Sequence, residues 1–285
     1  MVELLIGSII EGIMMGFIYI LMSLGLTMLY GIMHIVNFAH GEIYMLGAMG
    51  VYFLSERFKI PYFFSLLIVA VASVPFGLLI DRVIFRPIRG NWLQLLVATV
   101  GLTLILQSGS WISFGILDKA VKSPFKSVVY FWTATISTER LFAAIVGALL
   151  VILLVLLIYR TKVGRAMRAI EEDEDGARLQ GVSPDTVSAI NVSIGFMLAA
   201  IAGGLMAPIF VVNPGMGLPA VLMAFNVVII GGLGSVPGCI LGGLFCGLIQ
   251  TVGAVFLGVE LTYGLLFALL IAVLVIRPTG LLGHA

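Results

Sequence analysis

The sequence predicts an all-α, polytopic integral membrane protein with about eight transmembrane helices, since a helix needs roughly 20 apolar residues to cross a bilayer. Of its 285 residues, 61% are hydrophobic and 10% are charged, whereas a soluble domain is about 25% charged. The apolar residues form long runs rather than short alternating segments, which argues against a transmembrane β-barrel. We therefore expect a single transmembrane domain that covers residues 1–285.

A charged segment, residues 160–186, separates two of these apolar runs. Between Gly164 and Gln180 it consists mostly of good helix formers, and Gly176 is the weak point of the expected helix. Arg168 and Glu172 are four residues apart, a spacing at which an ion pair adds about 0.3 kcal/mol to a helix. The segment is therefore expected to form a short helix outside the bilayer.

The last part of the charged segment carries a helix stop followed by a helix start. Gly181 suits the left-handed conformation past a helix end. Ser183 is typical of an N-cap, and Pro184 of the first helical position after it. The resulting sharp turn has two interpretations, an ordinary solvated hairpin between two spans or a docking helix for a cytoplasmic partner, and we favour the second.

Polar residues gather at the start of an otherwise apolar segment, residues 34–54. Several polar side chains so close together are costly to place in lipid, so we expect them to face protein or a water-filled route. We also expect the helix to break near residues 34–42. Two of them are histidines six positions apart, on different helix faces, so a metal site is not expected. The polar positions and the glycine among them are His34, Asn37, His40, Gly41 and Glu42.

A second interrupted or re-entrant region is predicted at residues 212–238. Prolines and glycines are frequent in residues 208–219, and a glycine-rich break follows at residues 231–238. Backbone of this kind is tolerated at membrane depth only inside protein or beside a polar cavity, and a pair of interrupted segments indicates a translocation route. From polarity alone, the candidates for that route are Asn37, His40, Glu42 and Asn226.

Several glycine pairs spaced four apart predict close helix packing rather than chemistry. They are Gly12 with Gly16, Gly238 with Gly242, and Gly243 with Gly247. The glycine-rich run at residues 231–238 lacks the lysine of a phosphate-binding loop, so no nucleotide site is expected there.

Composition and motif content weigh against two other classes of function. A net charge of +1 with no basic patch gives no basis for nucleic-acid binding. The intramembrane carboxylates Glu11, Glu42 and Glu260 are scattered, and no Ser-His-Asp or Cys-His set is evident, so an enzyme is not expected. No catalytic, metal-binding or cofactor-binding residue is assigned.

The distribution of lysine and arginine predicts the orientation. Residues 81–91, the charged segment and Arg277 hold most of the basic residues and are placed in the cytoplasm. The N-terminus is then external, and the C-terminus is internal if two helices lie between Ala220 and Leu257. The loop at residues 116–140 is expected outside the membrane and partly helical. The basic residues on the external side are Arg57, Lys59, Lys119, Lys122, Lys126 and Arg140.

Four stretches resemble the permease subunits of branched-chain amino acid (LIV-type) ABC importers. The first is GRAMRAIEEDEDGARLQGVSPDTVSAINVSIGFMLAAIAGGLMAP, which matches the cytoplasmic loop and the helix after it in that family. The others are YGIMHIVNFAHGEIYMLGAMGVYFL, VVIIGGLGSVPGCILGG and RPTGLLG. They occur in the family's order, and with the layout of the spans the resemblance covers nearly the whole chain.

The resemblance implies a multi-pass protein of the bacterial inner membrane. With the orientation expected from the basic residues, its N-terminus is periplasmic and its C-terminus cytoplasmic. It implies a second related permease subunit in a hetero- or homodimer, two cytoplasmic ATPase subunits and a periplasmic substrate-binding protein. ATP and magnesium would be bound by the ATPases, and no cofactor by this chain. The family's ATPase-coupling positions map onto Gly164, Arg165, Arg168, Asp173, Glu174, Gly176, Ala177, Arg178, Leu179 and Gly181.

The function implied is a translocation path for branched-chain or related hydrophobic amino acids, driven by ATP hydrolysis on a separate subunit. The same class of permease moves amides, urea or aromatic acids, which are alternatives for the cargo. From the residues alone, an ion-coupled secondary transporter that uses the interrupted helices is a further alternative, and a polytopic membrane enzyme is the last.

Overall fold

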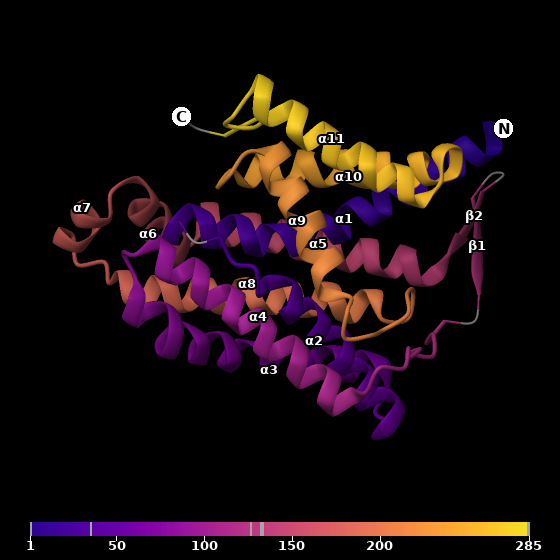
Figure 1. Ribbon diagram of the computed structural model, residues 1–285, viewed down its shortest axis with the longest axis horizontal. Helices are drawn as coiled ribbons and strands as arrows, with labels where there is room; N and C mark the ends of the chain where they lie inside the picture. Colours follow the sequence, from indigo (N-terminus) through magenta and orange to yellow (C-terminus); the bar gives the residue numbers. More distant parts are fainter. Residues whose placement is uncertain (1, 35, 126, 132–133, 284–285) are drawn as a thin grey trace.

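The computed structural model describes residues 2–34, 36–125, 127–131 and 134–283, and Lys126 lies outside these ranges. Within the described residues, seven helices are long and apolar enough to cross a membrane. They lie roughly alongside one another and form an all-α bundle (Figure 1). The seven are α1 (Val2–Met33), α3 (Tyr62–Ile80), α4 (Trp92–Phe114), α5 (Thr138–Arg160), α8 (Pro184–Met206), α10 (Val236–Leu257) and α11 (Val259–Ile276).

Shorter elements complete the bundle. Two half-length helices, α2 (His40–Tyr52) and α9 (Gly217–Gly231), belong to its interior. Two more, α6 (Lys162–Glu172) and α7 (Glu174–Leu179), form one end, and the hairpin of β1 (Val128–Phe131) and β2 (Ala134–Ser137) forms the opposite end (Figure 1). Three short helical turns continue α2 and α3, namely η1 (Phe53–Arg57), η2 (Asp81–Phe85) and η3 (Arg86–Ile88).

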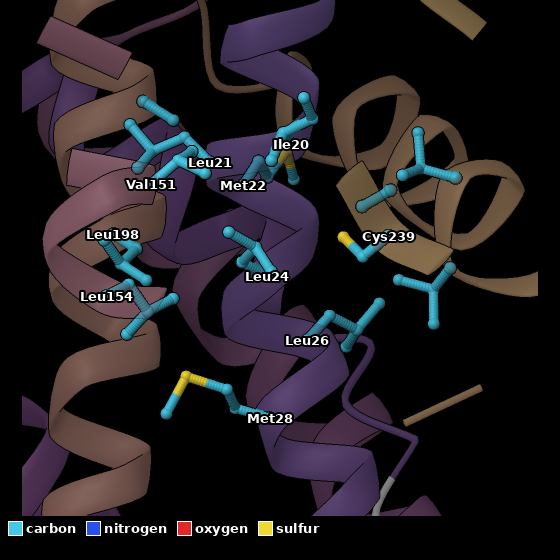
Figure 2. Packing of buried hydrophobic residues seen from close by; sticks show 14 of the residues in the cluster. Ile20, Leu21, Met22, Leu24, Leu26, Met28, Val151, Leu154, Leu198 and Cys239 are labelled. Atoms are coloured by element: carbon cyan, nitrogen blue, oxygen red, sulfur yellow. The ribbon is translucent and has the colours of Figure 1, made fainter. Parts of the chain in front are cut away.

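Helix α1 is the central element of the core. It packs against α5, α8, α9 and α10, and most of its side chains from Met14 to Leu29 are buried. Figure 2 shows Val151 and Leu154 of α5 and Leu198 of α8 on one side of α1, and Cys239 of α10 on the other. Since α1 is buried on opposite sides, its sequence is apolar all round, as expected for a helix surrounded by protein within a membrane.

An extensive helix contact joins α1 to α10 and explains two of the glycine pairs. A Cβ atom at Gly247 would lie 2.6 Å from the backbone nitrogen of Gly16, and one at Gly16 would lie 3.0 Å from the Cα atom of Leu244. Gly12 is equally confined, with Leu248 only 2.9 Å from its missing Cβ. The predicted close packing is confirmed, because only glycine lets the two backbones approach this far.

Both predicted interruptions are present. Helix α1 ends at Met33, and helix resumes only at His40, with His34 in the left-handed conformation (φ 52°). In the second half of the chain, residues 207–216 form turns between α8 and α9, and residues 232–235 form a tight turn before α10, whose first turn is capped by Ser235. Adding α2 and α9 as broken crossings to the seven long helices brings the number of crossings slightly above the expected eight.

The loop after α4 differs from the expectation that it is partly helical. Its second half is the β1–β2 hairpin, in which Val128 pairs with Ser137 and Val129 with Ile136. β-branched residues are frequent in both strands, and such residues favour a strand over a helix. A further antiparallel bridge joins Lys119 to Val212, which ties this loop to the turns before α9.

The two ends of the bundle differ in charge and in the terminus they hold. In Figure 1 the N-terminus lies at the end that carries the β-hairpin, and the C-terminus lies at the end that carries α6 and α7. Most of α9 (Gly217–Gly231) and all of α10 lie between Ala220 and Leu257, which meets the condition set above for termini on opposite sides. The chain therefore crosses the bundle an odd number of times.

Candidate functional site

The charged segment folds as two short helices at the end of the bundle (Figure 1). Thr161 caps α6 by accepting a hydrogen bond from the backbone nitrogen of Gly164 at 3.1 Å. Gly164 packs on the carbonyl of Ile158, where a Cβ atom would overlap it. Met167 and Ile170 are buried on the same face of α6. One face of α6 is thus held by the bundle, and the other is left to solvent.

Arg168 fastens α6 to the end of α5. Its guanidinium donates to the backbone carbonyl of Ile158 and lies over the ring of Tyr159, 5.2 Å from the ring centroid. The expected pair of Arg168 with Glu172 is wrong, because no ion pair joins them within the described residues. A bond to a free carbonyl at the C-terminus of a helix outweighs an exposed pair worth about 0.3 kcal/mol.

Helix α7 is about one and a half turns long and is capped at its N-terminus. Asp173 is its N-cap and accepts from the backbone nitrogen of Asp175 at 3.1 Å. The break between α6 and α7 therefore falls at Asp173 rather than at the expected weak point, Gly176. At the other end Gly181 has φ 82°, and the nitrogen of Val182 donates to the carbonyl of Ala177 at 3.0 Å, which confirms the predicted glycine stop.

The predicted coupling residues divide into two groups in the structure. Gly164 and Ala177 are buried and shape the two helices, and Gly176 packs against the Asp173 carboxylate. Leu179 is the last residue of α7, and 88% of its surface is exposed. The exposed charged members around it are Arg165, Asp173 and Arg178, and the Arg178 guanidinium is paired with Glu174 at 2.6 Å.

A network of ion pairs connects this end of α8 to residues 81–91, called here the arginine-rich loop. Asp185, in the first turn of α8, pairs with Arg86 and with Arg89, the latter at 2.8 Å. Behind it, buried Asp81 accepts from the hydroxyl of Ser188 at 2.7 Å and lies 3.6 Å from Arg89. The sequence predicted that the two loops lie on the same side of the membrane, but it did not predict these ion pairs. The spacing of the arginines was the signal that could have predicted them.

The two interrupted segments meet in the middle of the bundle. Helices α2 and α9 pack together, and a Cβ atom at Gly41 would lie 2.8 Å from the Cβ atom of Val221. A Cβ atom at Gly217 would lie 2.6 Å from a carboxylate oxygen of Glu42. This carboxylate therefore lies at the N-terminal end of α9, where the helix dipole favours negative charge.

The four candidates for the translocation route are all buried around this junction. His40 contacts the carbonyl of Met22 through Nε2 at 2.9 Å, and the Asn37 side chain accepts from the backbone nitrogen of Ala39. Asn226 donates only to the carbonyl one turn back in its own helix. Each candidate retains one polar atom without a hydrogen-bond partner. Their contact with a transported solute stays a prediction.

A cavity of about 440 Å³ lies beside this junction, and none of the four candidates lines it. It contains a hydrogen-bonded row of three side chains that sequence reasoning missed. Tyr19 donates to Oε1 of Gln250, and Nε2 of Gln250 donates to the hydroxyl of Tyr263 at 3.1 Å. These residues come from α1, α10 and α11, and nothing in their local sequence indicates that they meet.

Comparison with known proteins agrees with this arrangement. Residues 8–274 match the family model described as the permease component of the branched-chain amino acid transport system. The chain belongs to this family. It is 34% identical to the high-affinity branched-chain amino acid transport system permease protein BraD of Pseudomonas aeruginosa, over 97% of this chain and 95% of that protein. No solved structure matches.

Other permeases of the family extend the comparison. The chain is 35% identical to LivH of Escherichia coli over 96% of this chain and 94% of that protein. It is also 24% identical to LivM of the same organism, over 93% of this chain and 68% of that protein. A membrane permease is a transport subunit and not itself an enzyme, so the family and the seven candidate spans agree on a protein that forms a path through a membrane.

Proposed function

We propose that this chain is a permease subunit of an ATP-driven ABC importer and forms the path for branched-chain or related hydrophobic amino acids. The relatives are named as permeases of high-affinity branched-chain amino acid transport systems. The observation that carries the proposal is the pair α6–α7, a fixed amphipathic unit at one end of a bundle made of membrane-spanning helices. Such a unit suits contact with a soluble subunit that supplies the energy.

The proposal includes the partners that this arrangement needs. Two ATPase subunits bind ATP and magnesium and contact α7, and this chain binds no cofactor of its own. A second related permease completes the path, and similarity to both LivH and LivM supports pairing with a related but different chain. A periplasmic binding protein delivers the amino acid at the end of the bundle that carries the β-hairpin.

The orientation follows from the same reasoning. We place the protein in the bacterial inner membrane with the N-terminus in the periplasm and the C-terminus in the cytoplasm. Arg86, Arg89, Arg165, Arg168 and Arg178 then lie at the cytoplasmic end, as the excess of basic residues in cytoplasmic loops requires.

Movement of α7 reaches the bundle through defined contacts. Arg168 ties α6 to α5, and Asp185 ties the first turn of α8 to the arginine-rich loop after α3. Closure of the ATPases shifts the bundle only to the extent that they bind its two states unequally.

The test is uptake of leucine by vesicles that contain this chain with its partner permease, ATPases and binding protein. We expect uptake that requires internal ATP and that persists when ion gradients are collapsed. Uptake that stops with the gradients while ATP is intact would instead identify an ion-coupled carrier. Parallel vesicles supplied with urea, an aliphatic amide or an aromatic acid identify a different cargo of the same permease class.

A further inference from the structure

The cavity beside the α2–α9 junction has the size and place of a site for a small solute. Its volume of about 440 Å³ falls within the roughly 300–1,000 Å³ of small-molecule pockets. It lies toward the β-hairpin end, because the end of α8, the turns at residues 210–216 and the start of α11 contribute to it. Exposed Phe210 and Val211 are part of its wall. In the proposed orientation the cavity therefore lies in the periplasmic half.

Most of the wall is apolar and adaptable. No described residue that lines the cavity is charged. Methionine is flexible and polarisable, and surfaces rich in it accept ligands of several shapes. The methionines in the wall are Met22, Met206, Met216 and Met223, contributed by α1, α8, the turn before α9 and α9.

The polar row in the wall retains hydrogen-bonding capacity. An amide nitrogen has two hydrogens and a tyrosine has one, so the amide of Gln250 and the hydroxyl of Tyr263 each keep a donor beyond their mutual bonds. Polar groups within membrane helices are costly, and they mark routes for polar solutes. The acyl chains of a lipid could form no hydrogen bond with these three side chains.

The cavity is also connected to both interrupted helices. Tyr44 of α2 and Pro219 of α9 line it, and Met22 holds His40 through its carbonyl. A shift of α2 against α9 therefore changes the shape of the wall. This is the behaviour that a site needs if it is to be open in one state of the transporter and closed in the other.

We propose that this cavity binds the transported solute, and that it accepts a small solute without net charge that has an apolar body and a polar head. The methionine wall contacts the apolar body, and the row of Tyr19, Gln250 and Tyr263 contacts the head. Met223 sets how large the apolar body can be. The inference rests on the proposed function and names the residues that give that transport its specificity.

The first test measures the ratio of phenylalanine to valine turnover in the assembled transporter, with the binding protein saturated by each amino acid in turn. Met223→Ala removes bulk from the wall and should raise this ratio about tenfold, the effect of one or two methylene groups in an apolar pocket. Met49→Ala is the matched control, because Met49 is fully buried in α2 and does not line the cavity. An unchanged ratio in Met223→Ala overturns the assignment.

The polar row is tested by removing single hydroxyl groups. Tyr263→Phe should lower the turnover of both amino acids at least about tenfold, since it removes a hydrogen bond to a charged head. Tyr62→Phe is the control, because Tyr62 also loses one hydrogen bond, to the carbonyl of Gly204, but does not line the cavity. Turnover within twofold of the unmodified protein in Tyr263→Phe, at equal amounts in the membrane, refutes a role for the row.

Thiol labelling gives a readout that does not require uptake. The two native cysteines, Cys239 and Cys246, are buried, so a cysteine introduced as Ala220→Cys reports on the cavity alone. Leucine-loaded binding protein should slow its labelling in the assembled transporter, and should leave Leu261→Cys, on an exposed part of α11, unaffected. Equal labelling rates at Ala220→Cys with and without leucine mean a cavity filled by lipid and overturn the proposal.

The outcomes separate this inference from the proposed function. If the unmodified transporter moves neither amino acid with ATP, the proposed function fails, and protection of Ala220→Cys by leucine still decides whether the cavity binds it. If transport is normal but the ratio, the turnover and the labelling are all unaffected, only the cavity assignment fails.

Discussion

At the scale of single residues, the bundle depends on a few positions where two backbones approach closely. Gly217 is such a position, since a Cβ atom there would lie 2.6–2.8 Å from the atoms of the Glu42 carboxylate. Both the glycine and the carboxylate are buried where α2 meets α9. Any side chain at this position must displace the buried Glu42 carboxylate.

Gly217→Ala should therefore destabilise the protein by about 1–3 kcal/mol, the usual cost of overpacking. Thermal unfolding of the purified protein in detergent measures the effect. Gly264→Ala is the control, because nothing lies within 4 Å of the Cβ atom that it would add. This control should be neutral or slightly more stable, as expected for alanine in a helix. Equal melting temperatures for the two variants would contradict the close contact.

Substitution of Leu179 should weaken binding of the ATPase while leaving the stability of the protein almost unchanged. Because 88% of its surface is exposed, Leu179→Ala should change stability by less than about 0.5 kcal/mol. If Leu179 inserts into the ATPase, the same change should weaken ATPase binding about tenfold, since truncating an apolar anchor costs more than 1 kcal/mol. Binding of the ATPase to the permease in nanodiscs measures this.

Leu281→Ala serves as the comparison for Leu179→Ala. Leu281 is also an exposed leucine at the α7 end of the molecule, with 43% of its surface accessible, but it lies outside the α6–α7 unit. If both variants lose ATPase affinity equally, α7 has no special part in docking.

At the scale of elements, α6 and α7 owe their shape to local signals and their position to the bundle. The sequence predicted the glycine stop at Gly181, but it did not predict the caps Thr161 and Asp173 or the break between the two helices. Their attachment to the bundle was not predicted either, because Arg168 reaches back to Ile158 and Tyr159 of α5 instead of pairing along its own helix. The α6–α7 unit is attached to the bundle through α6, so it can transmit a displacement of α7 only while it remains helical.

Replacing residues 176–179 by a flexible glycine-serine linker of equal length should leave the protein in the membrane. It should abolish ATP-driven uptake, because a disordered linker transmits no displacement. Uptake by vesicles, normalised to the amount of permease, measures the loss. Uptake at the normal rate would show that α7 does not couple the ATPase to the bundle.

At the scale of the whole molecule, charge is divided between the two ends of the bundle. The arginine-rich loop, the ion pairs of Asp185 and the α6–α7 unit lie together, and the β-hairpin lies at the other end (Figure 1). An impermeant thiol reagent can determine which end faces the cytoplasm, because both native cysteines are buried.

In intact cells, Lys122→Cys should react with such a reagent once the outer membrane is permeable, because Lys122 is an exposed position before the β-hairpin. Glu172→Cys, exposed at the end of α6, should react only in inside-out vesicles. Labelling of Glu172→Cys from the periplasm would reverse the proposed orientation and place α7 out of reach of any ATPase.

The sequence by itself determined the fold class, the positions of both interruptions, the glycine stop at Gly181 and the helix start at Ser183. These features depend on composition and on neighbours within a few residues, such as Ser183 with Thr186. It also placed the basic loops at one end, since their charge cannot enter lipid.

Only the tertiary structure decided which helix faces meet. It brought Gly41 against Val221, Asp185 against Arg86, and Gln250 between Tyr19 and Tyr263. The physical reason is that a membrane helix is apolar on its lipid face and on its protein face alike, so hydrophobic periodicity does not distinguish them. Partners far apart in the sequence are selected by shape and by hydrogen bonds, which appear only when the helices are packed.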